Sequence, residues 1–208
     1  MKIRRPARLA LLDTVALGIA GGVWLQDARR PADEFQLPAE DICIVPPSAA
    51  SPAHAWDPAA GLARYEARPI PANARCPVCG MYPARFPKWA AQIIFSDRTA
   101  HFFDSPVDLF MFLDQTARFD PAHTVADVAA MYVADYRSGA WLDAHSAAFV
   151  LGAAVRGPMR GADLPAFADE ASARIFAGEH GGRVLLFDGI DHRTVASLRD
   201  ANHANHAH

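Results

Sequence analysis

The chain has 208 residues, of which 51% are hydrophobic and 21% charged, and its formal net charge is −3 at pH 7. This length allows one large domain or two small ones, and the composition is that of an ordinary globular protein. The small net charge gives no sign of a polyanion partner, and no basic stretch with interleaved aromatic residues of the kind that binds nucleic acid is recognised. Three cysteines are too few for a disulfide framework.

The first 28 residues predict a signal peptide or an N-terminal membrane anchor. A basic stretch, residues 1–8, precedes an apolar run, residues 9–25, in which Asp13 is the single charged residue. A basic segment followed by an apolar one is the pattern of a secretory signal, and the run is close to membrane-spanning length. A buried core helix is the alternative.

Residues 29–74 are predicted to form a Pro-rich linker or extended arm. The segment holds eight prolines, and no apolar period in it is long enough for a helix of normal length. Cys43 lies in this segment, far from the other two cysteines. We therefore expect it to be a small buried hydrophobic residue or a bystander and not a ligand.

Three sulfur-containing residues, Cys76, Cys79 and Met81, stand close together in the stretch Cys-Pro-Val-Cys-Gly-Met. The proline and the glycine favour a bent, non-helical backbone. Thiolate and thioether sulfur are soft ligands, which together suit Cu(I) better than a hard cation. The cysteine pair alone also fits a thiol–disulfide oxidoreductase, one half of a structural zinc site, or a structural disulfide.

Several features bear on these alternatives. A thioredoxin-like cysteine pair opens a helix, whereas Pro83 and Pro87 follow here and disfavour one. Structural zinc needs a second pair of ligands, and no further Cys-x-x-Cys or His-x-x-x-His pair follows in the predicted folded part. A disulfide between Cys76 and Cys79 is compatible with export. We recognise no hydrolase motif, nucleotide-binding glycine loop or paired acidic site, so the chain is predicted not to be an enzyme.

Residues 75–138 are predicted to form a β-β-α-β unit that begins with the cysteine motif. Residues 89–95 predict a strand, and residues 99–103 predict its hairpin partner. Ser105 is the expected N-cap of a helix that opens with a proline, and a further strand is expected within residues 125–136.

Residues 139–190 are predicted to repeat this order. Strands are expected at residues 147–152, 164–168 and 183–187, and a helix at residues 170–180 that is capped by Asp169 and directs Ala171, Ile175 and Phe176 inward. Short helices on small sheets make the fold class α+β. The repeated order of elements predicts two related units that arose by internal duplication.

Two features outside the cysteine motif are further candidates for metal binding. Met159 lies in a Gly/Pro turn between two predicted strands, and such turns lie on the surface. Its thioether is therefore a candidate fourth ligand or a lid, with packing onto the core as the alternative. The tail, residues 191–208, begins with a short predicted helix at residues 191–198 and ends with His203, His206 and His208, which could bind borderline metals, although termini are often disordered. The other histidines considered lack metal-ligand spacing: His101, His123, His145 and His180.

The order of these motifs resembles the NosL family of nitrous oxide reductase accessory proteins. The motifs Cys-x-x-Cys-Gly-Met, Trp-Ala-Ala-Gln-Ile and Phe-Phe-Asp-Ser-Pro-Val-Asp-Leu-Phe are followed by Trp-Leu-Asp-Ala, Gly-Pro-Met and Gly-Gly-Arg-Val-Leu-Leu-Phe-Asp. The resemblance covers about residues 75–190. It implies two related β-β-α-β units and a Cu(I) site in which Cys79 and Met81 match the core motif. Cys76 matches the two-cysteine version of that motif.

The resemblance also implies a location and partners. It implies a periplasmic metallochaperone that passes copper by ligand exchange towards nitrous oxide reductase, together with an ABC-type membrane complex. Family members are typically lipoproteins, yet no cysteine stands near the end of the apolar run at residues 9–25. Any association with the inner membrane is therefore expected to depend on the N-terminal segment.

Overall fold

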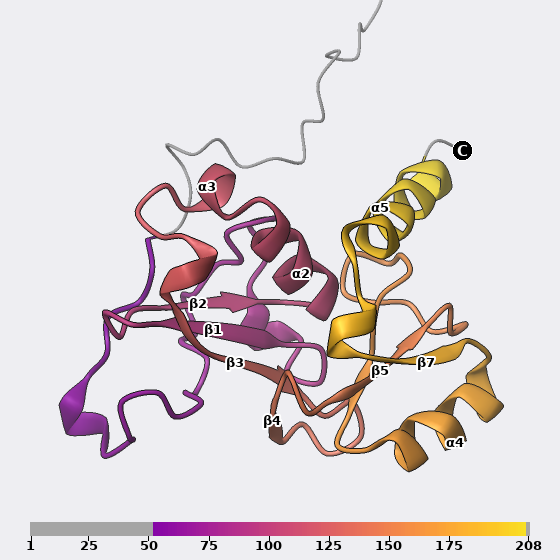
Figure 1. Cartoon of the computed structure of the whole chain (residues 1–208), viewed down its shortest axis with the longest axis horizontal. Coiled ribbons are helices and arrows are strands. Elements are labelled where there is room, and N and C mark those ends of the chain that lie inside the picture. Colours follow the sequence, from indigo (N-terminus) through magenta and orange to yellow (C-terminus); the bar gives the residue numbers. More distant parts are fainter. Residues whose placement is uncertain (1–51, 207–208) are drawn as a thin grey trace, which may run out of the picture. The chain divides into compact units, whose positions relative to one another are not determined.

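The computed structural model describes residues 52–206. These residues contain two small antiparallel β-sheets (Figure 1). The side chains of residues 52–200 are described, and these residues all belong to one compact unit. The predicted signal or anchor, Cys43 and residues 207–208 lie outside the described residues. Within residues 52–206, none of the helices has the length and apolar character needed to cross a membrane.

The first sheet has the strand order β2-β1-β3-β4 and the second has the order β6-β5-β7. The strands are β1 (Ala91–Phe95), β2 (Ala100–Phe103), β3 (Val128–Ala134), β4 (Trp141–Asp143), β5 (Ala148–Leu151), β6 (Ala166–Phe167) and β7 (Arg183–Leu186). The α-helices are α2 (Pro106–Asp114), α3 (Thr116–Phe119), α4 (Glu170–His180) and α5 (His192–His206). Short 3-10 helices are η2 (Pro58–Ala60), η3 (Pro83–Arg85), η4 (Val125–Asp127) and η5 (Phe187–Gly189).

The predicted α+β class and the strands and helices of both units are confirmed. In each unit the first strand lies between the second and the third and pairs with both in antiparallel fashion. Both units therefore share one connectivity, while their origin by duplication stays a prediction. Strand β4 pairs with β3, so residues 141–143 extend the first sheet, whereas the sequence pattern assigned them to the second unit. The final helix continues to His206, beyond the segment in which the tail helix was expected.

Strand β1 is buried on both faces because its side chains alternate between two apolar layers. Ile93 and Phe95 face the core that includes α2, whereas Ile94 faces the opposite side. This opposite side is covered by the described part of the arm, where Tyr65 and Ile70 pack beside it.

The arm is held to the first sheet by backbone and side-chain hydrogen bonds. The Arg68 backbone N–H donates to Gln92 Oε1 at 2.9 Å, and Gln92 Nε2 donates to the Arg68 carbonyl at 3.1 Å. His54 forms an isolated antiparallel bridge with Ala100. Residues 52–74 thus contain no helix longer than η2, as the prolines predict, and they lie against the sheet.

Both main helices start at the predicted caps. Ser105 accepts a hydrogen bond from the Asp108 N–H, and Asp169 accepts one from the Ser172 N–H. The inward face predicted for α4 is partly wrong: Phe176 is buried, but Ile175 is 54% exposed and Ala171 is also exposed. The inward residues follow the helical spacing of three and four from Ala173 through Phe176 and Ala177. Ile175 therefore lies on the opposite side of the helix.

Candidate metal centre

Residues 76–81 form a closed loop that presents two thiols from one turn. The Cys76 N–H donates to the Met81 carbonyl at 2.8 Å, and the Gly80 N–H donates to the Cys76 carbonyl at 2.9 Å. Gly80 has a φ of +75°, a conformation that a side chain at this position would strain. The predicted bent backbone is therefore confirmed. Cys76 is buried, whereas Cys79 is partly exposed, and both thiols are free.

Two carboxylates from another part of the first unit face these thiols. Asp104 directly follows β2, and Asp108 lies in the first turn of α2. Cys76 Sγ donates to Asp108 Oδ2 at 3.2 Å, and Cys79 Sγ donates to Asp104 Oδ1 at 3.0 Å. One ligand atom from each of the four residues lies within 4.8 Å of all the others. We call these four residues the thiol–acid cluster.

The sequence analysis missed this acidic pair and stated that no paired acidic site is present, which the structure corrects. The signal was the stretch Asp-Ser-Pro-Val-Asp, in which the two aspartates stand four residues apart across the Ser105 N-cap. Such spacing at a helix start brings side chains to one side. The zinc hypothesis was judged only on cysteine and histidine pairs, whereas Asp104 and Asp108 place two further candidate ligands, with oxygen donors, beside the thiols.

Burial without a neighbouring cation dominates the electrostatics of the thiol–acid cluster. Asp104 Oδ2 is buried and has no hydrogen-bond partner, and none of the described residues forms an ion pair with Asp104 or Asp108. Burial, followed by the Asp104 charge, raises the pKa of Asp108 well above its usual value. Burial also raises the pKa of the Cys76 thiol to about 12. The hydrogen bond with Cys76, followed by burial, raises the pKa of Cys79. The cluster therefore retains protons that a bound cation would displace.

A third buried carboxylate, Asp163, connects this region to the turn that carries Met159. Its Oδ1 accepts hydrogen bonds from the N–H groups of Val107 (3.3 Å) and Leu164 (2.8 Å). Burial raises the pKa of Asp163 to about 7. A Cβ atom added to Gly157 would lie 2.1 Å from Asp163 Oδ2, so the turn packs its backbone directly against this carboxyl group.

The two methionines occupy different positions. Met81 is partly buried at the end of the cysteine loop. Met159 is 38% exposed, in a turn that is closed by a hydrogen bond from the Gly157 N–H to the Gly161 carbonyl. The predicted surface position of Met159 is thus confirmed. The proposed roles of both thioethers as ligands stay predictions.

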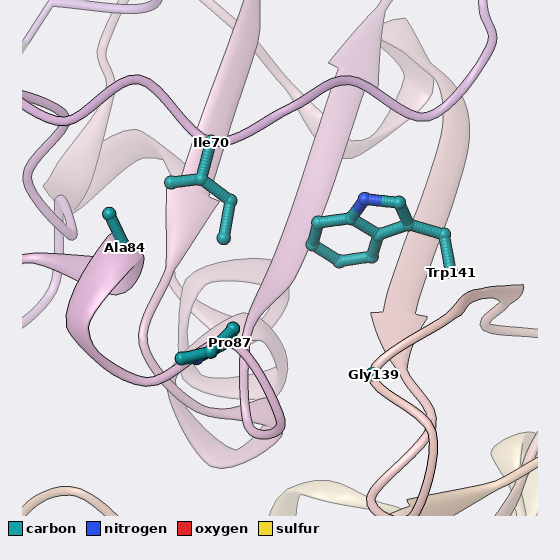
Figure 2. Close-up of a pocket in the computed structure, with 5 residues that line it drawn as sticks. All are labelled: Ile70, Ala84, Pro87, Gly139 and Trp141. Atoms are coloured by element: carbon teal, nitrogen blue, oxygen red, sulfur yellow. The ribbon is translucent and has the colours of Figure 1, made fainter.

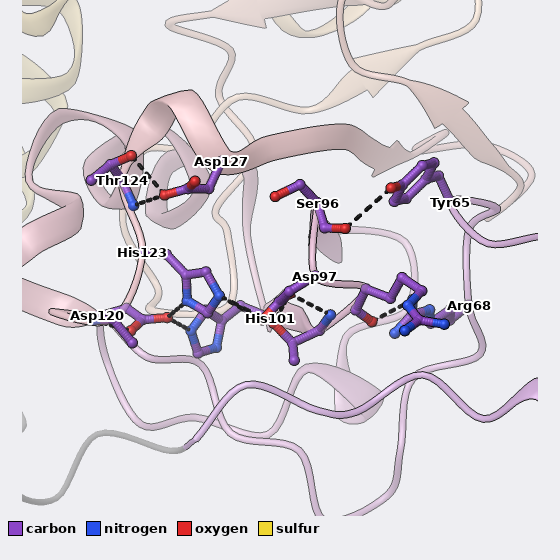
Figure 3. Close-up of polar contacts among 12 residues, drawn as sticks. Tyr65, Arg68, Ser96, Asp97, His101, Asp120, His123, Thr124 and Asp127 are labelled. Carbon is purple, nitrogen blue, oxygen red and sulfur yellow. Dashed lines mark hydrogen bonds and ion pairs between the residues drawn. The ribbon is translucent and has the colours of Figure 1, made fainter.

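A second polar cluster, which we call the His–Asp network, joins two histidines that the sequence analysis treated as scattered (Figure 3). His101 Nε2 lies 2.8 Å and His123 Nδ1 lies 2.7 Å from the same oxygen, Asp120 Oδ2. His123 Nε2 lies 3.1 Å from Asp97 Oδ2. The hydrogen bond with His101 is the largest contribution that lowers the pKa of Asp120. Burial tends to lower the pKa of His123, but hydrogen bonds to Asp120 and then Asp97 outweigh it and raise that pKa.

The remaining histidines with described side chains lie elsewhere. The His145 ring contacts Phe187, with ring centroids 4.2 Å apart, and the His180 ring similarly contacts Phe176 at 4.4 Å. His192 Nδ1 lies 2.8 Å from Asp114 Oδ2. The side chains of the tail histidines His203, His206 and His208, for which both metal binding and a disordered tail were considered, lie outside the described residues.

Comparison with known proteins places this arrangement of elements and side chains in a family. The family model of NosL matches residues 67–195. The copper-binding lipoprotein NosL of Stutzerimonas stutzeri is 34% identical over 143 residues, which are 64% of this chain and 71% of that protein. The copper chaperone NosL from Shewanella denitrificans has a crystal structure that matches with a TM-score of 0.54 and 28% identity, over 62% of this chain and 98% of that one.

The solution structure of apo-NosL from Achromobacter cycloclastes aligns over 50% of this chain and 87% of that one, with 25% identity and a TM-score of 0.38. The resemblance found in the motifs is confirmed by the family match and by the curated relative. This chain belongs to the NosL family.

Proposed function

We propose that this chain is an exported Cu(I)-binding metallochaperone that delivers copper for the maturation of nitrous oxide reductase. The observation that carries the proposal is the pair of free thiols, Cys76 and Cys79, held in one closed loop whose last residue is Met81. Soft sulfur donors favour Cu(I). Relatives of this chain are named a copper-binding lipoprotein and a copper chaperone, which supports a metal-binding and non-enzymatic role.

The carboxylates make the cluster electrostatically suited to a cation. Asp104 and Asp108 accept hydrogen bonds from the two thiols and lie buried without a positive partner among the described residues. Binding of copper requires deprotonated thiols, and the positive charge of the metal offsets the negative charge that this creates. A cation that binds here would therefore replace the protons that the cluster retains at neutral pH.

The exposure of the two thiols differs, which suggests an order of ligand exchange. Cys76 is 1% exposed, whereas Cys79 and Met81 are partly exposed. A ligand from an acceptor protein can reach the copper from the side of Cys79 and Met81 while Cys76 still holds it. Met159 is the proposed fourth ligand or lid. The acceptor is nitrous oxide reductase or its ABC-type assembly complex, and residues 1–28 act as the signal or anchor that places the chain in the periplasm.

The local structure gives less support to a thiol–disulfide oxidoreductase. Such enzymes use a thiolate of lowered pKa at the start of a helix. Here the pKa values of both thiols are raised, and the loop continues into the short 3-10 helix η3. Both features disfavour nucleophilic attack by Cys76 or Cys79.

A divalent cation is the second candidate, because the structure supplies four ligand residues. Two thiolates and two carboxylates can bind zinc in a tetrahedral site. The ligand atoms of Cys76, Cys79, Asp104 and Asp108 are close enough for one ion. In this hypothesis Asp104 and Asp108 bind the metal directly, and Met81 is not required.

Competition titration of the reduced protein tests the proposal. We expect one equivalent of Cu(I) to bind in the presence of a competing chelator, and to bind more tightly than Zn(II). A Cys79→Ser, Met81→Leu variant is expected to lose Cu(I) affinity by on the order of 100-fold or more. Cys43→Ser is the matched control and should bind as the wild type does. Wild-type affinity in the double variant would overturn the proposed site, and a preference for Zn(II) would favour the second candidate.

Delivery requires a separate measurement. Copper-loaded protein is mixed with copper-free nitrous oxide reductase and its assembly complex, and copper in the reductase is measured over time. We expect faster filling than with the same concentration of chelated Cu(I). Equal rates would contradict a role in delivery while leaving the metal site intact.

A further inference from the structure

The turn that carries Met159 has a buried base and an exposed tip. Gly157 and Gly161 at its two ends are buried, and the Gly157 N–H donates to the Gly161 carbonyl at 2.9 Å. Met159 and Arg160 are exposed at the tip, and Arg160 has a φ of +60°, in the left-handed region that residues other than glycine seldom adopt. A turn in this conformation depends on its surroundings, so the contacts of the buried base hold it in place.

The base of this turn packs directly on the carboxyl group of Asp163. A Cβ atom added to Gly157 would lie 2.1 Å from Asp163 Oδ2 and 2.8 Å from Asp163 Cγ, so only glycine allows this approach. Asp163 itself is 6% exposed. Buried groups in close contact have little room to move independently. The position of the turn, and with it the position of Met159, therefore depends on Asp163.

The same carboxyl group also binds the start of helix α2. Asp163 Oδ1 accepts a hydrogen bond from the Val107 N–H at 3.3 Å, and Val107 directly precedes Asp108. The first N–H groups of an α-helix lack an intrahelical partner, so Asp163 supplies one from the second unit. Asp108 Oδ2 in turn accepts from Cys76 Sγ at 3.2 Å. A continuous series of contacts thus connects the Met159 turn, Asp163, the first turn of α2 and the thiols.

Asp163 is the one buried polar side chain that the second unit contributes among the residues whose side chains are described. The other buried polar side chains, those of Asp104 and Asp108 included, all lie within residues 68–135. Apolar contacts have no preferred direction, whereas the hydrogen bond to the Val107 N–H requires a particular distance and angle. The carboxyl group therefore fixes the turn of the second unit relative to α2 more closely than apolar packing alone would.

We propose that Asp163 is a positioning residue of the copper site, which holds the Met159 turn beside the start of α2 so that the Met159 thioether can join a copper ion bound by the two thiols. This inference rests on the proposed function and adds the residue that connects the proposed fourth ligand to the thiols. Asp163 acts through Met159 and not as a ligand, because its Oδ1 already accepts two hydrogen bonds from backbone N–H groups and its Oδ2 lies against Gly157.

Cu(I) affinity and copper X-ray absorption of the reduced full-length protein test the inference. Asp163→Ala is expected to lower Cu(I) affinity about tenfold, as is usual when a residue that orients a metal ligand is removed. It should also remove one sulfur from the copper coordination shell, as Met159→Leu should. Asp163→Asn keeps an oxygen that accepts from the same N–H groups, so its Cu(I) affinity is expected to lie within about threefold of the wild type.

Gly157→Ala tests the same contact with Asp163 intact. The added Cβ atom occupies the space of the carboxyl group and pushes the turn away from it. The φ of Gly157 does not lie in the left-handed region, so alanine is not strained there by the backbone itself. We expect about the same tenfold loss of Cu(I) affinity and the same lost sulfur as in Asp163→Ala. This variant decides the question if Asp163→Ala does not fold.

A double-mutant cycle separates positioning from a general loss of stability. Because Asp163 acts through Met159, Asp163→Ala should change Cu(I) affinity by less than about twofold in a Met159→Leu background. The contact can also be measured without copper. In the metal-free protein, the Val107 amide should exchange its hydrogen faster in Asp163→Ala than in Asp163→Asn, because only alanine removes the acceptor.

Two controls are matched to these variants. Asp120→Asn lowers stability in the His–Asp network and leaves the thiol–acid cluster unchanged. Ala84→Phe adds a large side chain at an exposed position in a surface hollow beside strand β4 (Figure 2). None of the residues that line this hollow belongs to the thiol–acid cluster or to residues 156–164. They are Ile70, Ala84, Pro87, Gly139 and Trp141. Both controls are expected to keep the Cu(I) affinity and the sulfur count of the wild type.

The remaining outcomes separate this inference from the proposed function. Wild-type Cu(I) affinity and sulfur count in Asp163→Ala or Gly157→Ala would overturn the positioning role and leave the copper site intact. An equal effect of Asp163→Ala with and without Met159, or an unchanged sulfur count in Met159→Leu, would overturn it as well. Absence of Cu(I) binding by the wild type would contradict the proposed function itself, and the inference with it.

Discussion

Asp108 and Asp120 are both buried carboxylates of the first unit, but their surroundings have opposite electrostatic effects. Asp108 lies among Asp104 and two thiols, and its pKa is raised. Asp120 accepts hydrogen bonds from two histidines, and its pKa is lowered. The carboxylate of the His–Asp network therefore has two imidazole partners, whereas the thiol–acid cluster has no basic partner among the described residues.

This difference separates a structural polar cluster from a candidate binding site. A buried acid that already has its partners stabilises the fold, and a further cation would gain little there. A buried acid without such partners stays protonated or binds a cation from outside. The same substitution, Asp→Asn, should therefore have different consequences at Asp120, Asp163 and Asp108.

The largest loss of stability is expected for Asp120→Asn. The substitution removes a negative charge shared by His101 and His123, and leaves the buried His101 ring with a poorer partner. We expect the free energy of unfolding to fall by about 3 kcal/mol, measured by urea denaturation at pH 6. Asp97→Asn, at the more exposed end of the network, is the control and should cost less than about 1 kcal/mol. A loss below 1 kcal/mol for Asp120→Asn would show that the network contributes little to stability.

An effect of intermediate size is expected when the stability of the metal-free protein is measured as a function of pH. The pKa of Asp163 is raised to about 7, so the folded chain holds this proton more tightly than the unfolded chain does. The contribution of Asp163 to stability therefore falls as the pH rises from about 4 to about 7 and levels off above, with an expected loss of roughly 2 kcal/mol. Urea denaturation at several pH values measures this loss.

Asp163→Asn is the matched variant for that measurement. Asparagine keeps an oxygen that can accept from the N–H groups of Val107 and Leu164 but cannot ionise. The pH dependence should become shallower. His123 contributes a separate part with the same sign, because its raised pKa gives stability that is lost as the pH rises through that value. An unchanged slope in Asp163→Asn would contradict burial of an ionisable group at this position.

The smallest effect on stability is expected for Asp108→Asn. The raised pKa keeps this carboxyl group largely protonated without metal, so a neutral amide of similar shape should change the free energy of unfolding at pH 7 by less than about 1 kcal/mol. Cu(I) affinity, in contrast, should fall by about tenfold because a negative charge beside the thiols is lost. The exposed Asp188→Asn serves as control for both measurements. Unchanged copper affinity would remove Asp108 from the site.

Much of the fold could be predicted because it depends on local patterns. Ser105 and Asp169 have short polar side chains that cap the helices they precede, and both caps are confirmed. Short apolar runs separated by the turn residues Ser96, Asp97 and Arg98 predicted β1 and β2. Ile175 was misplaced because helix α4 has apolar residues on more than one side, and only packing against Val150 and Phe167 selects the buried side.

The sequence alone indicated the thiols of the candidate metal site, since Cys76, Cys79 and Met81 are neighbours and their soft sulfur chemistry does not depend on the rest of the fold. It could not indicate which charges surround them. Asp104 and Asp108 reach the thiols only because β2 ends beside the cysteine loop, although their positions are 25 and 32 residues further along the chain than those of Cys79 and Cys76. The tertiary structure also placed His101 and His123 on one carboxylate. Burial and charge pairing are properties of contacts distant in sequence, and these contacts decided which acids need a cation and which do not.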